Sequence, residues 1–220
     1  SASGLAGVWS RDNTREAIWD ALARREVFAT TGTRLRVRVF AGWDFLEEDL
    51  ARSDFAKHGY ETGVPMGGDL KGPAEGRSPR VMVRALRDLD GANLDRIQII
   101  KGWLAEDGET RERIFDVVCS DGRAITADNR CERHVVDSVN AEAATYSNAS
   151  GEAAMQVYWE DPDFDPGLLA FYYVRVLEIP TPRWTTYDAT FFGVKRPELA
   201  PVSIQERAYT SPIWYTPATP

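Results

Sequence analysis

The 220-residue sequence is poor in the residues that most often carry enzyme chemistry. It holds two histidines, His58 and His134, and two cysteines, Cys119 and Cys131. Neither histidine lies in a recognisable nucleophile context, so the sequence gives no support for Ser-His-Asp or Cys-His catalysis. The spacing of these four residues fits no common zinc motif. A phosphate-binding glycine motif is also missing, because "PMGGDLKG" lacks both the spacing and the strand-to-helix context.

Long apolar runs and an excess of positive charge are missing as well. No run approaches the roughly 18 apolar residues of a membrane span, and no signal peptide is visible. The formal net charge of −8 argues against a general nucleic-acid binder. Hydrophobic residues at 43% and charged residues at 27% are ordinary globular values. Because the first residue is Ser rather than Met, we expect a processed form, an engineered form or a fragment.

One helix is expected near the start of the sequence. Asn13 precedes "TREAIWDALARRE" as an N-cap candidate, and Glu16 completes a capping-box arrangement. The helix should end near Glu26, because the run "VFATTG" breaks its periodicity. An apolar stripe at helical spacing is formed by Ala17, Ile18, Ala21 and Leu22. We expect this stripe to pack either on the following sheet or on a neighbour outside the sequence.

From Arg34 onward the hydrophobic period changes to two. "RLRVRVF" alternates arginines with Leu35, Val37 and Val39, which is typical of a strand. Further strands are expected over 80–86, 96–104, 111–119, 153–160, 170–179 and 206–216, the last interrupted by Pro212. "EDLARSDFAKHG" is expected to form a short helix in a loop. The pattern predicts a mainly β chain, an antiparallel β-sandwich with an N-terminal α-helix and long loops.

The arginine face of "RLRVRVF" has two interpretations. Guanidinium groups bind carboxylate and phosphate bidentately, so this face is suited to an anion or an acidic polymer. The interpretation that we favour is a solvated strand face paired with some of the 34 acidic residues.

The two cysteines flank the eleven-residue stretch "SDGRAITADNR". Asp121-Gly122 and Asp128-Asn129 are turn formers, so this stretch is expected to fold back on itself. We predict a Cys119–Cys131 disulfide, which implies an oxidising compartment. The alternative is a pair of free thiols in a cytoplasmic protein.

Three aspartates alternate in "EDPDFDPG", at Asp161, Asp163 and Asp165. An EF-hand loop starting at Asp161 would need Gly and Glu where the sequence has Pro166 and Tyr172, so that motif fails. A looser calcium site remains an alternative, since calcium accepts carboxylates in flexible geometry. We favour a turn in which the aspartates cap the backbone and the prolines fix φ.

The stretch "EIPTPRWTTYD" (178–188) combines prolines with Arg183, Trp184 and Tyr187 after an apolar strand. These three residues are a candidate binding surface for a sugar or a neighbouring domain. The interpretation that we favour is a rigid proline turn whose aromatic side chains cover the end of the core.

Several long stretches together resemble the C-terminal region of the domain-of-unknown-function 3604 (DUF3604) family. They are "GLAGVWSRDNTREAIWDALARREVFATTGTRLRVRVFAGWDF" (4–45), "GVPMGGDL" (63–70), "LDRIQIIKGWL" (94–104), "WEDPDFDPGLLAFYYVRVLEIPTPRWTTYDA" (159–189) and "IQERAYTSPIWYTP" (204–217). That family, whose members are often exported, is similar to the polymerase-and-histidinol-phosphatase (PHP) group of metal-dependent hydrolases. "REAIWDALARREVFATTG" resembles the closing helix of the PHP metal-binding barrel.

The resemblance implies an N-terminal segment, 1–32, that closes such a barrel, and a β-sandwich domain over 33–217. It implies that the chain is a non-catalytic part of a larger periplasmic or secreted hydrolase, packing on the barrel and shaping its active-site mouth. Divalent metals are then expected in the barrel, with none of its ligands in this sequence. The partner is the barrel itself, or a second copy bound through the exposed helix face. The alternative function is a carbohydrate- or protein-binding module.

Overall fold

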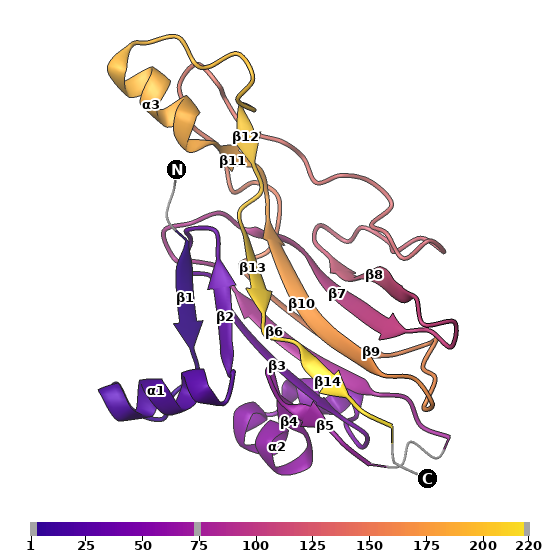
Figure 1. The fold of residues 1–220 in the computed structure, drawn as a ribbon. Coiled ribbons are helices and arrows are strands. Elements are labelled where there is room, and N and C mark those ends of the chain that lie inside the picture. The colour runs from indigo at the N-terminus through magenta and orange to yellow at the C-terminus, as the bar shows by residue number, and fades with distance from the viewer. Residues whose placement is uncertain (1–3, 73–75, 218–220) are drawn as a thin grey trace.

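Two β-sheets packed face to face form the body of the computed structural model, which describes residues 4–72 and 76–217 (Figure 1). The large sheet contains β1 (Leu5–Val8), β2 (Val27–Thr30), β5 (Asp69–Leu70), β7 (Leu94–Leu104), β8 (Thr110–Cys119), β10 (Ala170–Glu178), β13 (Arg207–Thr210) and β14 (Ile213–Tyr215). The small sheet contains β3 (Arg36–Gly42), β4 (Val64–Pro65), β6 (Arg80–Leu86) and β9 (Ala154–Glu160). The chain is therefore mainly β, as the sequence predicts.

Strand β10 is central in the large sheet. One of its edges pairs with β7 along the whole strand, and β7 in turn pairs with β8. Its other edge is shared by β13 and β14, which are separated at Pro212. The predicted break of the last strand at this proline is thus confirmed, because proline cannot donate a ladder hydrogen bond. All pairs in this sheet are antiparallel except β14 with β5.

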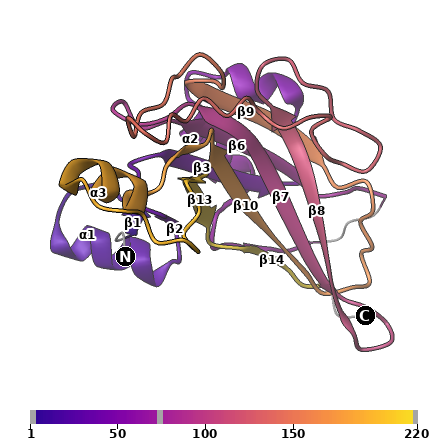
Figure 2. The same ribbon diagram turned by 90° about the horizontal axis from the view of Figure 1, so that it is seen from above.

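The small sheet has the order β4-β3-β6-β9 and is antiparallel throughout. In β3 the side chains of Val37 and Val39 are buried, whereas Arg36 and Arg38 lie on the opposite face. The two layers are seen from above in Figure 2, with the small sheet toward the top of the view and β10, β7 and β8 below it. The period-two alternation therefore places one apolar face of each sheet against the other.

The main core lies between these two inner faces. It contains Val37, Val81 and Val83 from the small sheet and packs them against strands β7, β10 and β13. The residues that the large sheet contributes include Ile97, Ile99, Val174, Val176, Ala208 and Ile213. Burial of branched aliphatic side chains of this kind stabilises by about 1.5–3 kcal/mol each, so this face fixes the strand register.

Helix α1 (Arg15–Ala23) follows β1 and is shorter than predicted. Its N-cap is Thr14 rather than Asn13, because the Thr14 Oγ1 accepts a hydrogen bond from the Ala17 backbone N–H at 3.2 Å. The predicted apolar stripe divides between two surroundings, since Ala21 is fully buried while Leu22 is 46% exposed. Residues 27–30, expected only to end the helix, form β2, which pairs with β1 and β13.

The predicted short helix in the loop after β3 is present in two parts. A 3-10 turn, η1 (Glu47–Ala51), precedes helix α2 (Phe55–Thr62). Both pack on the outer face of the small sheet, where Leu50 and Phe55 contact Phe40 and Met82 in a second core cluster. Within the described residues, no helix has the length and apolar character needed to cross a membrane.

The interpretation of 178–188 as a proline turn is wrong in part. After the short pair β11 (Thr181–Pro182) and β12 (Ser203–Ile204), residues Trp184–Phe192 form helix α3. The prolines end before Trp184, so nothing prevents helix formation from there to Gly193, whose φ of 63° ends the helix. Helices α1 and α3 lie on the same side of the sandwich in Figures 1 and 2, with β1 between them in Figure 1.

Candidate functional site

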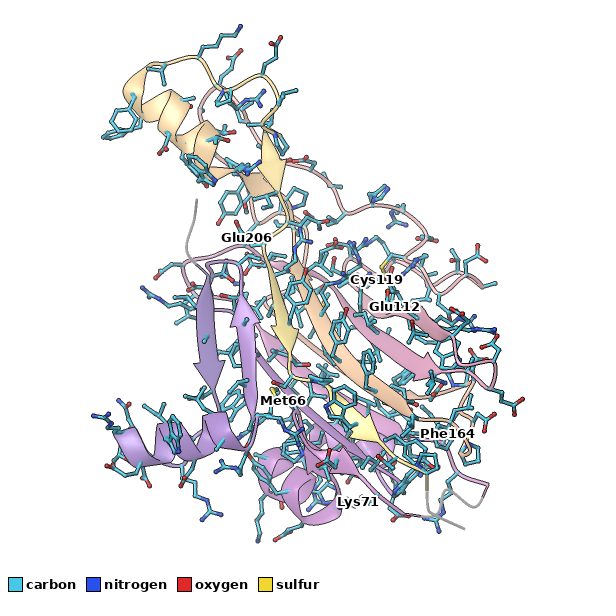
Figure 3. The ribbon with its side chains drawn as sticks, viewed as in Figure 1. Met66, Lys71, Glu112, Cys119, Phe164 and Glu206 are labelled. Atoms are coloured by element: carbon cyan, nitrogen blue, oxygen red, sulfur yellow. A yellow bond between two sulfur atoms is a disulfide. The ribbon has the colours of Figure 1, made fainter. Side chains whose placement is uncertain are left out.

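The alternating aspartates form two successive side-chain-capped turns between β9 and β10. Asp161 Oδ1 accepts from the backbone N–H of Asp163 at 2.9 Å, and Asp165 Oδ1 accepts from that of Gly167 at 2.8 Å. Figure 3 labels Phe164 within this turn, where its ring contacts Tyr215 at a centroid distance of 5.0 Å. The aspartate carboxylates accept hydrogen bonds from backbone N–H groups that have no strand or helix partner in the turn, as aspartate commonly does.

Asp161 is fully buried and contacts two other polar side chains at this end of the sandwich. Lys101 Nζ lies 2.6 Å from Asp161 Oδ2, and the Tyr172 hydroxyl donates to the same oxygen at 2.6 Å. Lys101 and Tyr172 are directly opposite each other on β7 and β10. Burial, with the adjacent negative charge of Asp161, raises the pKa of Tyr172 far above its usual value, so this hydroxyl stays protonated.

The other two aspartates of the turn have different partners, and that of Asp165 is the Gly167 backbone N–H. Asp163 forms an ion pair with Arg113 of β8, and its backbone carbonyl accepts from Lys101 Nζ at 2.7 Å. The three carboxylates therefore lie in separate environments, each with at least one protein donor. Calcium binding by this turn stays a prediction, which the melting temperature with and without calcium would test.

Cys119 and Cys131 are joined by a disulfide, as predicted. Figure 3 labels Cys119 at the end of β8. The loop that it closes is tied to the strand a second time, because Asp116 Oδ2 accepts from the Cys131 backbone N–H at 2.8 Å. Asp116 and the two sulfurs are close enough to suggest a metal site, but both sulfurs are committed to the covalent bond. A loop of this length gives about 3 kcal/mol of stabilisation in the chain-entropy model.

The predicted binding residues Arg183, Trp184 and Tyr187 lie at the start of α3. Arg183 is the N-cap, and Trp184 and Tyr187 are 41% and 43% exposed. The more exposed residues of this segment, Phe191 at 82% and Phe192 at 66%, were not predicted from the sequence. The proline-free run from Trp184 to Gly193 is the sequence signal that could have predicted this helix and its exposed side chains.

Helix α1 also exposes apolar side chains, at Trp19 (69% exposed) and Leu22 (46%). Monomeric soluble proteins rarely expose several large apolar side chains close together, and such groups mark interaction surfaces. We call the exposed apolar residues of α1 and α3 the helix surface, which has two separate parts because α3 lies near the top and α1 near the bottom of Figure 1. Its residues are Trp19, Leu22, Trp184, Tyr187, Phe191 and Phe192.

A cavity of about 530 Å³ opens on the outer face of the large sheet. One cross-strand row lines it, with Trp214, Phe171, Gly102 and Glu112 opposite one another on β14, β10, β7 and β8. A side chain at Gly102 would collide with the Phe171 ring, whose Cζ lies 2.3 Å from the position of a Cβ. The glycine thus lets an aromatic ring lie flat on the sheet, a surface that we call the aromatic pocket.

A buried carboxylate lies at the far end of β10. Glu178 is 1% exposed, and no described residue hydrogen-bonds to its Oε1. Burial raises the pKa of Glu178 to about 7, and the negative charges of Glu206 and Asp88 act in the same direction. Glu206 is labelled in Figure 3 beside this end of β10. With this pKa, the Glu178 carboxyl group is about half protonated at pH 7 and mostly protonated at lower pH.

These features define a disulfide-linked antiparallel β-sandwich with two helices that expose apolar side chains on one side. Residues 1–217 match the family model described as "Protein of unknown function (DUF3604)", and the chain belongs to this family. No curated protein and no solved structure matches the chain.

Proposed function

We propose that the chain is a non-catalytic β-rich unit of a larger exported protein and packs on a PHP-like metallohydrolase barrel. The observation that carries the proposal is the helix surface, where Trp19 of α1 and Phe191 of α3 are 69% and 82% exposed. Side chains of this size are normally buried, so a partner that covers both helices would gain apolar contact area.

The identity of the partner rests on the resemblance of "REAIWDALARREVFATTG" to the closing helix of such a barrel. In this proposal the barrel supplies the metal ligands, because the two histidines of the chain lie in other contexts. His58 Nε2 is 3.1 Å from Asp49 under the small sheet, whereas His134 lies in the loop after β8. The Cys119–Cys131 disulfide supports the exported location, since disulfides persist in oxidising compartments.

The test begins with the coding sequence upstream of this segment, where the proposal expects His and Asp metal motifs. That region and the present chain would be expressed separately and their association measured by surface plasmon resonance. The double variant Trp19→Ser/Leu22→Ser is expected to weaken binding at least about tenfold, because buried tryptophan is a frequent interface hot spot.

Leu104→Ser is the matched control, since Leu104 is 40% exposed at the end of β7, on the side opposite α1 and α3. Its affinity should equal that of the unmodified chain. An upstream region without metal motifs would remove the barrel from the proposal. Association that is unchanged in the Trp19→Ser/Leu22→Ser variant would remove the helix surface. A concentration-dependent dimer of the chain alone would point to a second copy as the partner.

A second candidate function is carbohydrate binding, and the aromatic pocket favours it. Ligand pockets combine apolar and aromatic walls with a few polar groups, and here Trp214 and Phe171 lie beside Glu112. On a glycan array, Trp214→Ala should abolish binding at this pocket, whereas loss in Trp184→Ala would place the sugar on α3. Trp19→Ala is the control for removal of an exposed tryptophan. Absence of any retained glycan would reject this function.

A further inference from the structure

The outer face of the small sheet is only half covered. Helix α2 and η1 pack over Phe40 and Met82, and beyond them a groove of about 630 Å³ runs across β3, β6 and β9. Three arginines line this groove: Arg36 and Arg38 from β3, and Arg84 from β6. We call it the arginine groove. These are the residues of the arginine face noted in the sequence, joined by one arginine from the neighbouring strand.

Arg38 and Arg84 are placed directly opposite each other in the antiparallel pair of β3 and β6. Like charges in this position are destabilising. Among the described residues, no carboxylate lies within ion-pair distance of Arg36, Arg38 or Arg84. The expected pairing with acidic neighbours is therefore not found as direct ion pairs of these three arginines. Asp88 is the acidic neighbour of Arg34 and Arg36, because the Arg34 backbone N–H and the charges of both arginines lower the pKa of its carboxyl group.

Arg38 reaches a carboxylate only through the Tyr60 hydroxyl, which accepts from Arg38 Nη2 and donates to Glu26. Arg84 has no such link among the described residues, so an anion in the groove would offset a charge that the chain leaves unpaired.

Another arginine on the same face of β6 shows the contrast. Arg80 is opposite Glu160 on β9 and forms an ion pair with it at 3.2 Å. Arg84 is opposite Gln156, a neutral residue, on the same strand β9. The sheet thus provides a carboxylate for one arginine and leaves the other without one, in a chain with a net charge of −8.

The two guanidinium groups are also fixed in position. Arg84 Cζ lies 4.1 Å from the ring centroid of Phe55, and its Nη2 donates to the Arg52 carbonyl at 2.9 Å. Arg38 Cζ lies 4.1 Å from the Trp9 ring, and its Nη2 donates to the Tyr60 hydroxyl at 3.2 Å.

Within the described residues, the Nε of both arginines is buried and lacks a hydrogen-bond partner. Burial without a counter-charge lowers the pKa of Arg84. Side chains held in this way lose little conformational entropy when they bind a ligand.

We propose that the arginine groove binds a tetrahedral oxyanion, the phosphate or sulfate group of an organic ester. The phosphate or sulfate group of a monoester offers three terminal acceptor oxygens, and the phosphate group carries up to two negative charges. It therefore matches three guanidinium groups better than a carboxylate, which offers two oxygens. Phe55 and Trp9 supply apolar walls for the organic part of the ester. This site lies on the other sheet from the aromatic pocket, and two of its residues, Trp9 and Arg38, also line the cavity beside α1.

The test is isothermal titration calorimetry of the full chain with inorganic phosphate and, separately, inorganic sulfate, at an ionic strength held constant with sodium chloride. Saturable one-site binding of one or both anions is expected, and the two arms identify which ester the groove accepts. Arg38→Gln/Arg84→Gln should weaken binding at least about tenfold, because hydrogen bonds to charged groups are the strong ones. Arg36→Gln, a change at an exposed position, should weaken it about threefold or more even where the double variant folds poorly.

Arg80→Gln is the matched control, because it removes an arginine from the same face that already has a carboxylate partner. Its affinity for the anion should stay unchanged. A lack of saturable heat with both anions would overturn the proposal, and so would equal weakening by Arg80→Gln. Acetate binding as tightly as phosphate or sulfate would overturn the assignment to a tetrahedral group.

Discussion

Replacing Lys101 by methionine is expected to lower the free energy of unfolding by about 3–5 kcal/mol. The lysine stem is replaced by a side chain of similar shape, but Asp161, whose side chain is fully buried, loses the ammonium group at 2.6 Å. An uncompensated buried charge is far more costly than the loss of a surface ion pair. Urea unfolding at pH 7, followed by tryptophan fluorescence, measures the difference.

Two further variants separate charge burial from a general packing defect. Lys101→Met/Asp161→Asn removes both charges while keeping an oxygen for the Asp163 backbone N–H, so it should recover most of the lost stability. Lys57→Met removes a lysine that is 72% exposed and pairs with Glu61 at 3.9 Å, and it should change stability by no more than about 0.5 kcal/mol. Equal effects of Lys101→Met and Lys57→Met would contradict the buried-pair account.

Replacing Glu178 by glutamine is expected to remove a pH dependence that the unmodified chain shows between about pH 4.5 and 7. The folded chain holds a proton on Glu178 up to a pKa of about 7, against 4.5 for the free side chain. The stabilisation is full at low pH and is lost as the pH rises, because the unfolded chain releases this proton first. The loss reaches about 3 kcal/mol at pH 8, at about 1.4 kcal/mol for each pKa unit.

Urea unfolding at pH 5 and pH 8 tests this expectation. Glu178→Gln should be the more stable protein at pH 8, and its stability should change less between the two pH values than that of the unmodified chain. Glu112→Gln is the control, because Glu112 lies exposed on the outer face of the large sheet. If Glu178→Gln and the unmodified chain show the same pH difference, the buried carboxyl group ionises normally and the explanation fails.

The strands could be predicted from the sequence because alternation is a local property. Val37 and Val39 against Arg36 and Arg38 specify both a strand and its buried face. The DUF3604 membership was likewise available from long stretches of sequence. Helix α3 was not predicted, because apolar and polar residues in "WTTYDATFF" show no clear helical stripe and the adjacent prolines suggested a turn.

The polar sites depend on strand register, which a single sequence does not reveal. Asp161 could be recognised as a turn former, but not as the partner of Lys101, since the two meet only after the sheets have formed. The same holds for Arg38 and Arg84, which become neighbours through the pairing of β3 with β6. Strand periodicity predicts the face of the sheet on which a charged side chain lies, whereas the tertiary fold determines which residue lies opposite it.

The pairing of β2 with β13 also has a consequence for how the chain is made. The first strand pair, β1 and β2, which helix α1 connects, joins the large sheet only through residues 207–210. During synthesis on the ribosome, the free edge of β2 stays unpaired until β13, near the end of the sequence, has been made. Contacts between such distant parts of a sequence form slowly, so we expect a high contact order and slow folding. A chain cut before β13 would leave the edges of β2 and β10 open as templates for aggregation.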